Sequence, residues 1–330
     1  MKKMDITTSE KLKNGAIAIK KTVKSGALAV RKTAKDSYTG WLFVLPLVIG
    51  LVVFTFVPMF QSLVYCFYQY DGVRVFEFIG FENFVYMFTV DRDFPIILKN
   101  TFLWTVISVP LNLVLSYAFA LFVNQKAKGM RFFRVLYYLP VIIPGVVSGL
   151  LWKDVFDPVY GIANSFLGAL GVAPESLPSW FEAENFTAMG TLLLMSVWGV
   201  GGGMVLWLAA LKAVPESLHE SAKLDGANAF VRLFVITIPM CSAMIFYNLL
   251  MQVIGSLQNF STYIVAPNSG KGNGNSLYMY AVKIYNTAFS GYKFEYGYAS
   301  ALAWFLFLII AVLTAVLFST SRWVYYGEEN

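Results

Sequence analysis

Six long apolar stretches, separated by shorter polar segments, divide this chain of 330 residues. Each stretch is close to the length that an α-helix needs to cross the hydrocarbon core of a membrane, roughly 20 residues. None of them alternates between apolar and polar positions, as the strands of a membrane β-barrel do. The stretches are Trp41–Leu63, Asn100–Val123, Val135–Trp152, Ala188–Leu211, Phe234–Leu257 and Tyr298–Ser319. They predict an all-α membrane protein with six transmembrane helices.

The overall composition supports this fold class. Hydrophobic residues make up 58% of the chain and charged residues 13%, and the mean hydropathy is +0.62. These values lie outside the range of soluble globular domains. The composition therefore excludes a soluble protein.

The distribution of Lys and Arg predicts the orientation. With the N-terminus inside the cell, eighteen of the 25 Lys and Arg residues fall in cytoplasmic segments and seven in external ones. An excess of basic residues marks the cytoplasmic side of a membrane protein. We therefore expect both termini, and the polar segment 215–239, to lie in the cytoplasm. The pI near 9.1 then reflects topology and gives no indication of nucleic-acid binding.

Residues 1–40 form a basic cytoplasmic tail with an internal repeat. Residues 13–23 are echoed by residues 24–34, a period of eleven residues that keeps equivalent positions on one face of a helix. One hypothesis is a helix lying on the anionic membrane lipid of the inner leaflet. The alternative is a partly disordered tail that only enforces orientation. A cleaved signal peptide does not fit, because the first apolar stretch is long and lacks a small-residue cleavage site.

The chain offers no set of residues for catalysis or metal binding. Its single histidine, His219, lies in the 215–239 segment, and no phosphate-binding G-x-x-x-x-G-K-[ST] motif is present. The cysteines, Cys66 and Cys241, fall near opposite faces of the membrane and cannot reach the roughly 7 Å that a disulfide requires. We expect no metal, no bound cofactor and no enzymatic activity, and any ATP hydrolysis must belong to a separate subunit.

The segment Pro215–Pro239 is a polar island between two apolar stretches. Pro215 ends the preceding helix and begins a short new one, and residues 216–224 are good helix formers. Gly226 follows, and glycine is the residue favoured just after the end of a helix. The segment contains Glu220-Ser221-Ala222, then Gly226, Ile236 and Pro239.

This spacing resembles the EAA loop of the inner-membrane permease subunits of bacterial ABC importers, with Ser221 at the second position of E-A-A and Ile238 in place of Leu. In that family the loop forms a short cytoplasmic helix that fits a cleft of the ATP-hydrolysing subunit. The resemblance implies a type I importer permease fold in residues 41–330. It also implies a second homologous permease, two ATP-binding subunits that use ATP and Mg, and an extracellular solute-binding protein. The residues expected to couple to the ATPase are Pro215, Glu216, His219, Glu220, Ser221, Ala222, Asp225, Gly226, Ile236 and Pro239.

Three further motifs point to one branch of the family. Residues 80–84 match a G-x-x-N-[FY] stretch, residues 225–227 read Asp-Gly-Ala, and residues 152–164 contain W-K followed by F-x-P-x-Y-G-x-x-N. The first resembles a stretch found in the family at large, and the second is common in its sugar-importing branch. The third resembles the first of two paired permeases in importers of oligosaccharides and glycerol phosphate esters, the maltose-type group. Turn chemistry at Pro158 and Gly161 would also explain the last motif.

The resemblance implies ATP-driven import of a sugar, expected to be an oligosaccharide, by alternating access in a bacterial cytoplasmic membrane. The alternatives are import of another solute such as a glycerol phosphate ester, a secondary transporter, or a receptor without transport. Secondary transporters normally carry ionisable residues inside their membrane helices, and the apolar stretches here hold almost none.

Polar residues in the fifth apolar stretch indicate where a solute could pass. Asn248, Gln252, Gly255, Ser256 and Asn259 recur at spacings of three and four, which places them on one helix face. Such groups are costly at bilayer depth unless they are paired or line a wet cavity. We expect a substrate pathway formed by Tyr247, Asn248, Gln252, Ser256 and Asn259, with Trp198 and Trp207 as aromatic surfaces. The alternative is that the amides hold neighbouring helices together.

The glycines of residues 199–203 also allow two interpretations. They lie within an apolar stretch and have no following Lys, so they are no nucleotide site. Either they let the helix unwind as a gate, or they let two helices pack closely.

Overall fold

The computed structural model describes residues 40–73, 76–125, 127–184, 186–290 and 295–325. It divides into two units, Met1–Ser62 and Leu63–Asn330. The predicted tail with its repeat lies outside the described residues, apart from Gly40.

The first unit carries the first apolar stretch. A single helix runs over Gly40–Tyr65 with a mean hydropathy of 2.6. It contains the π-helical turn η1 (Val52–Phe56) and ends as α2 (Val57–Tyr65). Pro58 has no N–H to offer the carbonyl of Phe54, and the wider turn lies at this point. Side chains such as Phe43 and Phe54 are more than four-fifths exposed, which suits a helix that faces acyl chains.

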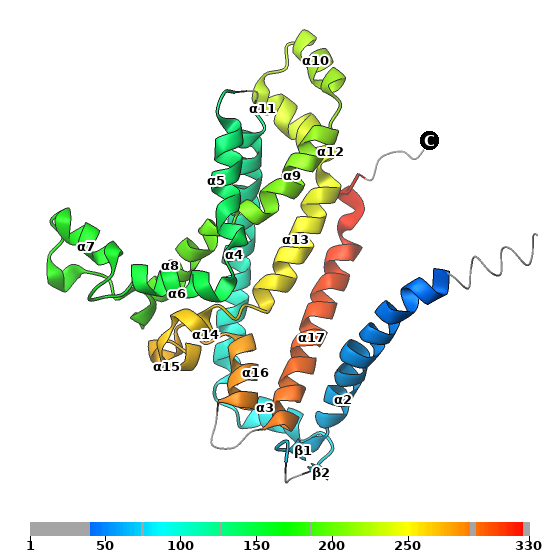
Figure 1. Cartoon of the computed structure of the whole chain (residues 1–330), viewed down its shortest axis with the longest axis vertical. Coiled ribbons are helices and arrows are strands. Elements are labelled where there is room, and N and C mark those ends of the chain that lie inside the picture. Colours follow the sequence, from blue (N-terminus) through cyan, green and yellow to red (C-terminus); the bar gives the residue numbers. More distant parts are fainter. Residues whose placement is uncertain (1–39, 74–75, 126, 185, 291–294, 326–330) are drawn as a thin grey trace, which may run out of the picture. The chain divides into compact units, whose positions relative to one another are not determined.

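The second unit is a helical bundle with a small hairpin (Figure 1). The hairpin pairs β1 (Tyr68–Tyr70) antiparallel with β2 (Phe76–Phe78). The helices are α3 (Glu82–Thr89), α4 (Phe94–Val123), α5 (Met130–Ile142), α6 (Gly145–Val155), α7 (Ile162–Ala169), α8 (Phe186–Trp198), α9 (Gly201–Ala213), α10 (Glu216–Leu224), α11 (Ala229–Arg232), α12 (Ile238–Met240), α13 (Ser242–Leu257), α14 (Thr262–Val265), α15 (Pro267–Gly270), α16 (Tyr280–Phe289) and α17 (Tyr296–Ser319). A π-helical turn, η4 (Leu233–Thr237), joins α11 to α12, and short 3₁₀ turns cover η2 (Pro174–Ser176), η3 (Trp180–Glu182), η5 (Asn273–Asn275) and η6 (Ser321–Trp323).

The six predicted stretches match the helices of the described residues. The first, second and last correspond to three helices long and apolar enough to span a membrane, Gly40–Tyr65, Phe94–Val123 and Tyr296–Ser319. The other three are bent pairs, α5 with α6 (98°), α8 with α9 (49°) and the 229–240 segment with α13 (70°), which gives up to six spans. The sharpest bend lies at Ile143, whose extended backbone is the conformation favoured before a proline such as Pro144.

Helix α4 forms the middle of the bundle, where it packs against α9 and α13. Two buried clusters flank it. One contains Ile97, Leu277 and Leu302, and the other contains Ala120, Met204 and Trp207. Cys66 and Cys241 are both buried and neither forms a disulfide, as predicted. Burial raises the pKa of Cys66 to about 12, so its thiol stays protonated and acts as a packing group.

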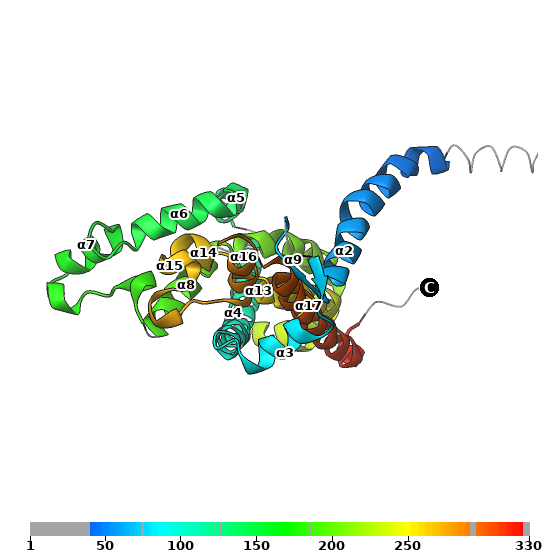
Figure 2. The same cartoon turned by 90° about the horizontal axis from the view of Figure 1, so that it is seen from below.

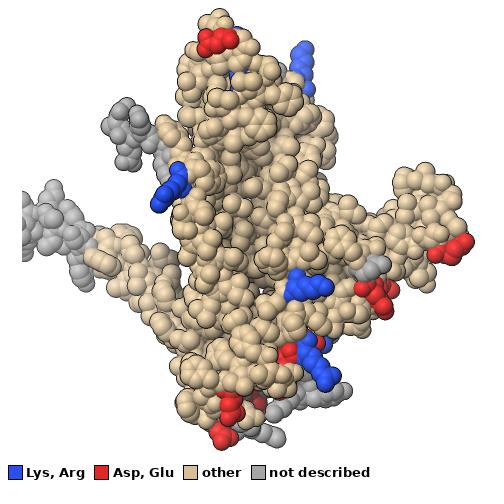
Figure 3. Space-filling model, turned by 180° about the vertical axis from the view of Figure 1, so that it is seen from behind, with Lys and Arg blue, Asp and Glu red and all other residues tan. Residues whose placement is uncertain are grey.

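The polar segments of the second unit gather at two ends of the bundle. Helix α10 and the end of α17 lie at one end, and the hairpin, α3 and α16 lie at the other (Figure 1). In Figure 3 most charged side chains lie toward these two ends and the surface between them is largely uncharged. This is the distribution that the Lys and Arg count requires. Which end faces the cytoplasm stays a prediction.

Asparagines of two motifs hold loops of the second unit, the first of them at the end that carries the hairpin. Asn83, in the G-x-x-N-F motif, donates from Nδ2 to the carbonyls of Cys66 (2.8 Å) and Tyr68 (3.1 Å). Asn164, at the end of the F-x-P-x-Y-G-x-x-N motif, donates to the carbonyls of Pro158 and Pro178 and accepts from Trp180. Both motifs therefore shape loops, and the turn chemistry predicted for the second is present.

An ion pair ties three elements together at the same end. The Lys283 ammonium lies 2.9 Å from Asp91 and 3.1 Å from Asp93, and the Tyr298 hydroxyl donates to Asp91. Burial alone would raise the pKa of Asp91, but the hydrogen bonds from Tyr298 and Lys283 and the Lys283 charge outweigh it and hold the pKa below its usual value. The pair fixes α16 and α17 to the segment between α3 and α4.

Candidate functional site: an exposed helix and an uncharged cavity

The predicted coupling segment folds as an isolated short helix. Pro215 takes an extended conformation and α10 begins at Glu216. At the other end the N–H of Gly226 donates to Lys223 and the N–H of Ala227 donates to Ala222. These two bonds, with Gly226 at a φ of +80°, form a Schellman motif, which ends a helix abruptly. The start and the stop predicted from the sequence are both present.

The surface of α10 is exposed along most of its length. Glu216, Glu220, Ser221 and Asp225 are exposed, while His219 and Ala222 are half-buried. Leu224 is 90% exposed and Phe230, in α11, is 73% exposed. Both of these apolar side chains are therefore left uncovered by the described residues. The sequence reasoning missed these two residues, although both stand out as apolar positions within a polar island.

The last two residues of the predicted coupling set, Ile236 and Pro239, lie beyond α10 in the segment that leads to α13. Asn228 caps α11 by accepting from the N–H of Val231, and the chain then passes through η4 and α12. Ile236, in η4, is half-buried and packs against the cluster around Trp207. Pro239 is exposed in α12, just before the 70° bend into α13. These two residues connect the exposed helix to the bundle.

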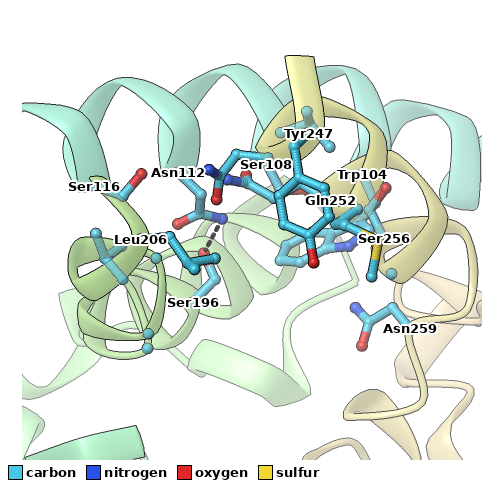
Figure 4. Close-up of a pocket in the computed structure, with 18 residues that line it drawn as sticks. Trp104, Ser108, Asn112, Ser116, Ser196, Leu206, Tyr247, Gln252, Ser256 and Asn259 are labelled. Carbon is cyan, nitrogen blue, oxygen red and sulfur yellow. Dashed lines mark hydrogen bonds between the residues drawn. The ribbon is translucent and has the colours of Figure 1, made fainter. Parts of the chain in front are cut away.

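The polar residues of the fifth stretch line a cavity of about 480 Å³ between α4, the α8–α9 pair and α13 (Figure 4). Its wall includes Asn248, Gln252, Gly255, Ser256 and Asn259, which were predicted to share one face, and also Tyr247. Helix α13 ends at Leu257, and Asn259 still reaches the cavity from the segment that follows. The structure thus brings together every residue of the predicted stripe.

The opposite wall was not predicted. It is formed by Trp104, Ser108, Asn112 and Ser116 of α4 and by Ser196 of α8. Ser108, Asn112 and Ser116 are spaced by four residues, so they form a polar stripe on α4 like the one on α13. That four-residue spacing is the signal in the sequence from which this wall could have been predicted.

The two predicted tryptophans do not line this cavity. Trp198 lies on the wall of a smaller neighbouring cavity of about 280 Å³, which shares Trp104, Ser196 and Asn259 with the first. Trp207 is fully buried, and its Nε1 donates to Ser116 Oγ at 3.0 Å. Trp207 therefore supports the wall from behind. Its assignment as an aromatic pathway surface is corrected accordingly.

Several polar atoms of the cavity wall are buried without a hydrogen-bond partner among the described residues. They are Asn112 Oδ1, Gln252 Oε1 and Asn259 Nδ2. Other groups are satisfied, since Asn112 Nδ2 donates to Ser196 and Asn248 Nδ2 donates to the Met244 carbonyl. Unpaired buried polar atoms are rare and call for a ligand, a water or a functional reason. The wall thus offers two free acceptors and one free donor.

The wall carries no charge. Its residues include no Asp, Glu, Lys, Arg or His in the described part of the chain. Amides, hydroxyls and the rings of Trp104 and Tyr247 form the whole surface, together with apolar groups. Such a surface can bind a hydroxyl-rich solute through hydrogen bonds and ring contacts.

The glycine segment adjoins the cavity and combines both predicted roles. Residues 199 and 200 separate α8 from α9 at the 49° bend. A Cβ on Gly201 would overlap the backbone carbonyl of Tyr137 in α5, so the two helices pack closely here. Gly203 lies near Ser116 and Asn248 at the cavity wall. Close packing is therefore established at Gly201, and the helix is interrupted beside it.

The chain matches a family of transport proteins. The model of the family described as "binding-protein-dependent transport system inner membrane component" matches residues 112–326. The chain is 38% identical over 320 residues to the probable ABC transporter permease protein YesP of Bacillus subtilis, covering 96% of this chain and 99% of that protein. It is 32% identical to the diacetylchitobiose uptake system permease protein NgcF of Streptomyces coelicolor, covering 86% of this chain and 82% of NgcF.

The fold agrees with a solved structure. A chain of a bacterial ABC transporter involved in the import of the acidic polysaccharide alginate superposes with a TM-score of 0.77 at 21% identity, covering 89% of this chain and 98% of that one. The match supports the type I importer permease fold predicted from the loop. The protein thus belongs to the family of inner membrane components of binding-protein-dependent transport systems, which are non-enzymatic, multi-pass transport subunits.

Proposed function

We propose that this chain is the permease subunit of an ATP-driven importer that carries an oligosaccharide into the cell by alternating access. The observation that carries the proposal is the uncharged cavity with two unpaired acceptors and one unpaired donor in its wall. A sugar presents hydroxyl groups that both donate and accept, so it can pair with acceptors and with donors. The name of the relative NgcF, a diacetylchitobiose uptake permease, supports a sugar as the substrate class.

The exposed helix α10 supports an external source of energy. We assign the end of the bundle that carries α10 to the cytoplasm, as the Lys and Arg count predicts, with both termini on the same side. Two ATP-binding subunits would hold ATP with Mg and contact α10 through Leu224 and the Glu220–Ala222 turn. Closure of these subunits would move α10 and tilt the bundle, opening the cavity to one side and then to the other.

The remaining partners follow from the transport cycle. A second homologous permease would complete the pathway, as the resemblance to the first of two paired permeases implies. An extracellular solute-binding protein would deliver the sugar at the end that carries the hairpin and α16. The solved structures with this fold include an alginate transporter in complex with its pentasaccharide-bound periplasmic protein, which supports such a partner.

Substitution on α10 tests the energy source. We expect Glu220→Lys to abolish co-purification of the ATP-binding subunit and ATP-driven uptake into vesicles. Glu175→Lys is the matched control, since Glu175 is an exposed acid in η2, far along the chain from α10. An unaltered E220K transporter, or a wild-type chain that never co-purifies with an ATPase, would contradict the proposal. A panel of sugars offered to the binding protein then identifies the substrate.

A further inference from the structure

Aromatic side chains at the hairpin end of the bundle form an unbroken series of ring contacts. In order, each ring centroid lies 4.6–5.9 Å from the next. We call this series the aromatic track. It consists of Phe260, Tyr263, Tyr285, Phe289, Tyr296, Tyr70 and Phe76. The rings come from α14 and the residue preceding Ser261, from α16, from the start of α17, and from β1 and β2.

The track begins next to a residue of the cavity wall. Asn259, which lines both cavities and has an unpartnered Nδ2, is followed directly by Phe260. Figure 2, which views this end from below, shows α14, α16 and α17 following one another across it. The far end of the track is Phe76, which is 56% exposed in the hairpin. The rings therefore run from the residue after Asn259 to an exposed ring of the hairpin.

The track remains partly open to contact. Phe289 is 56% exposed, and Tyr263, Tyr285 and Tyr296 are half-buried. The rings thus hold one another in place and still offer faces and edges at the surface. A ligand would meet a surface that is already ordered, which lowers the entropic cost of binding.

The composition of the track differs from the lipid-facing surfaces of this chain. The exposed residues of α17 include Phe307, Leu308, Val312 and Val316, with no polar atom among their side chains. Four of the seven track residues are tyrosines, which add a hydroxyl to each ring. A sugar ring can use both parts of a tyrosine, because its C–H face contacts the electron-rich ring face while its hydroxyls bond at the rim.

We propose that the aromatic track is a binding surface for the rings of an oligosaccharide, along which the sugar moves from the outer end of the bundle to the cavity. The proposal rests on the proposed function and adds an entry site to it. Stacking on successive rings lets a sugar slide, since each new contact replaces a similar one. No single ring then holds the substrate tightly.

Replacing one exposed ring tests the proposal. Phe289→Leu keeps an apolar side chain and removes the ring, and Phe289→Trp restores a ring. Phe307→Leu is the matched control, because Phe307 is similarly exposed, at 52%, on α17. In the assembled transporter we expect F289L to lower uptake at limiting oligosaccharide by about two- to tenfold. F289W and F307L should transport like the wild type.

A labelling experiment separates a sugar from the other occupant, the partner permease. Phe289→Cys introduces an accessible thiol, while Cys66 and Cys241 are buried. We expect a membrane-impermeant thiol reagent to label F289C in the assembled transporter, and saturating oligosaccharide to slow the labelling. A thiol that reacts in the isolated chain but is closed in the assembled complex would overturn the proposal and assign the track to the partner permease.

The two proposals fail in different ways. Wild-type transporter that imports no oligosaccharide would overturn both of them. If the wild type imports the oligosaccharide, F289L imports it equally well, and sugar does not slow the labelling of F289C, only the aromatic track is overturned.

Discussion

Gln252 distinguishes a solute pathway from a polar contact that holds helices together. Its Oε1 atom is buried in the cavity wall and accepts no hydrogen bond from the described residues. Gln252→Met keeps the length of the side chain and removes the amide. If the amide serves the solute, this change removes an interaction that exists only when the sugar is bound.

The two interpretations predict opposite effects on stability. A hydrogen bond between helices contributes about 0.5–1.5 kcal/mol, and its loss would destabilise the protein by that amount. An unpaired buried acceptor instead costs free energy, so its removal leaves stability unchanged or raises it by up to roughly 1 kcal/mol. For transport, loss of one hydrogen bond to the sugar predicts a decrease of about two- to tenfold in the apparent kcat/KM.

The matched control is Thr105→Val. Thr105 lies on α4 outside the cavity wall, and its Oγ1 accepts a 3.0 Å hydrogen bond from Ser256 Oγ on α13. This bond does join two helices, so T105V should lose about 1 kcal/mol of stability. Thermal unfolding of the purified complex and uptake into proteoliposomes measure the two properties. If Q252M lost stability as T105V does, and lost transport only in proportion to folded protein, the pathway assignment would be refuted.

Three further changes have expected outcomes. Gly226→Ala places an L side chain at a φ of +80° with open space around it, which strains the end of α10 by about 1–2 kcal/mol. This strain should weaken co-purification of the ATPase. Gly168→Ala, in open space within α7, is the control and should have no effect. Gly201→Ala should separate α5 from α9 and lower the unfolding temperature, whereas Gly190→Ala, with nothing near its Cβ, should not; equal behaviour of the two would contradict the close packing. Lys283→Met leaves Asp91 buried without its cation and should destabilise by about 3–5 kcal/mol near pH 7, unlike the exposed Lys153→Met. The pKa of Asp91 is lowered in the folded protein, so the stability that Lys283 adds is fully present above the unfolded pKa of about 3.9 and is lost as the pH falls through the folded pKa. In thermal unfolding, the difference between K283M and the wild type should therefore shrink in acid. A difference that stays constant with pH would argue against the ion pair.

The sequence predicted most of what depends on local chemistry. The six stretches, the limits of α10 at Pro215 and Gly226, and the common face of Asn248, Gln252 and Ser256 all follow from periodicity and from proline and glycine. These features are set by residues within a few positions of one another. The structure confirms the apolar stretches as candidate spans, and it confirms the predicted limits of α10 at Pro215 and Gly226.

What the sequence could not predict depends on contacts between distant segments. Trp207 was assigned to the pathway because aromatic surfaces suit sugars, but its Nε1 finds Ser116 on α4, 91 residues away, and this contact buries the ring. The angles of the bent pairs also depend on packing, since a proline or glycine shows where a helix can break but not how far it turns. The aromatic track joins residues 70 to 296, and no local pattern would connect them.

The coupling helix and the cavity are joined by two independent connections. One is the backbone, since α10 continues through η4 and α12 into α13, whose residues line the cavity. The other is the buried cluster in which Ile236 and Met240 pack with Trp207, which bonds to Ser116 at the cavity wall. Close-packed interiors transmit displacements because they compress little. We infer that movement of α10 reaches both walls of the cavity, α13 through the chain and α4 through Trp207. In the proposed cycle, Trp207 would then link a movement of α10 to the α4 wall of the cavity.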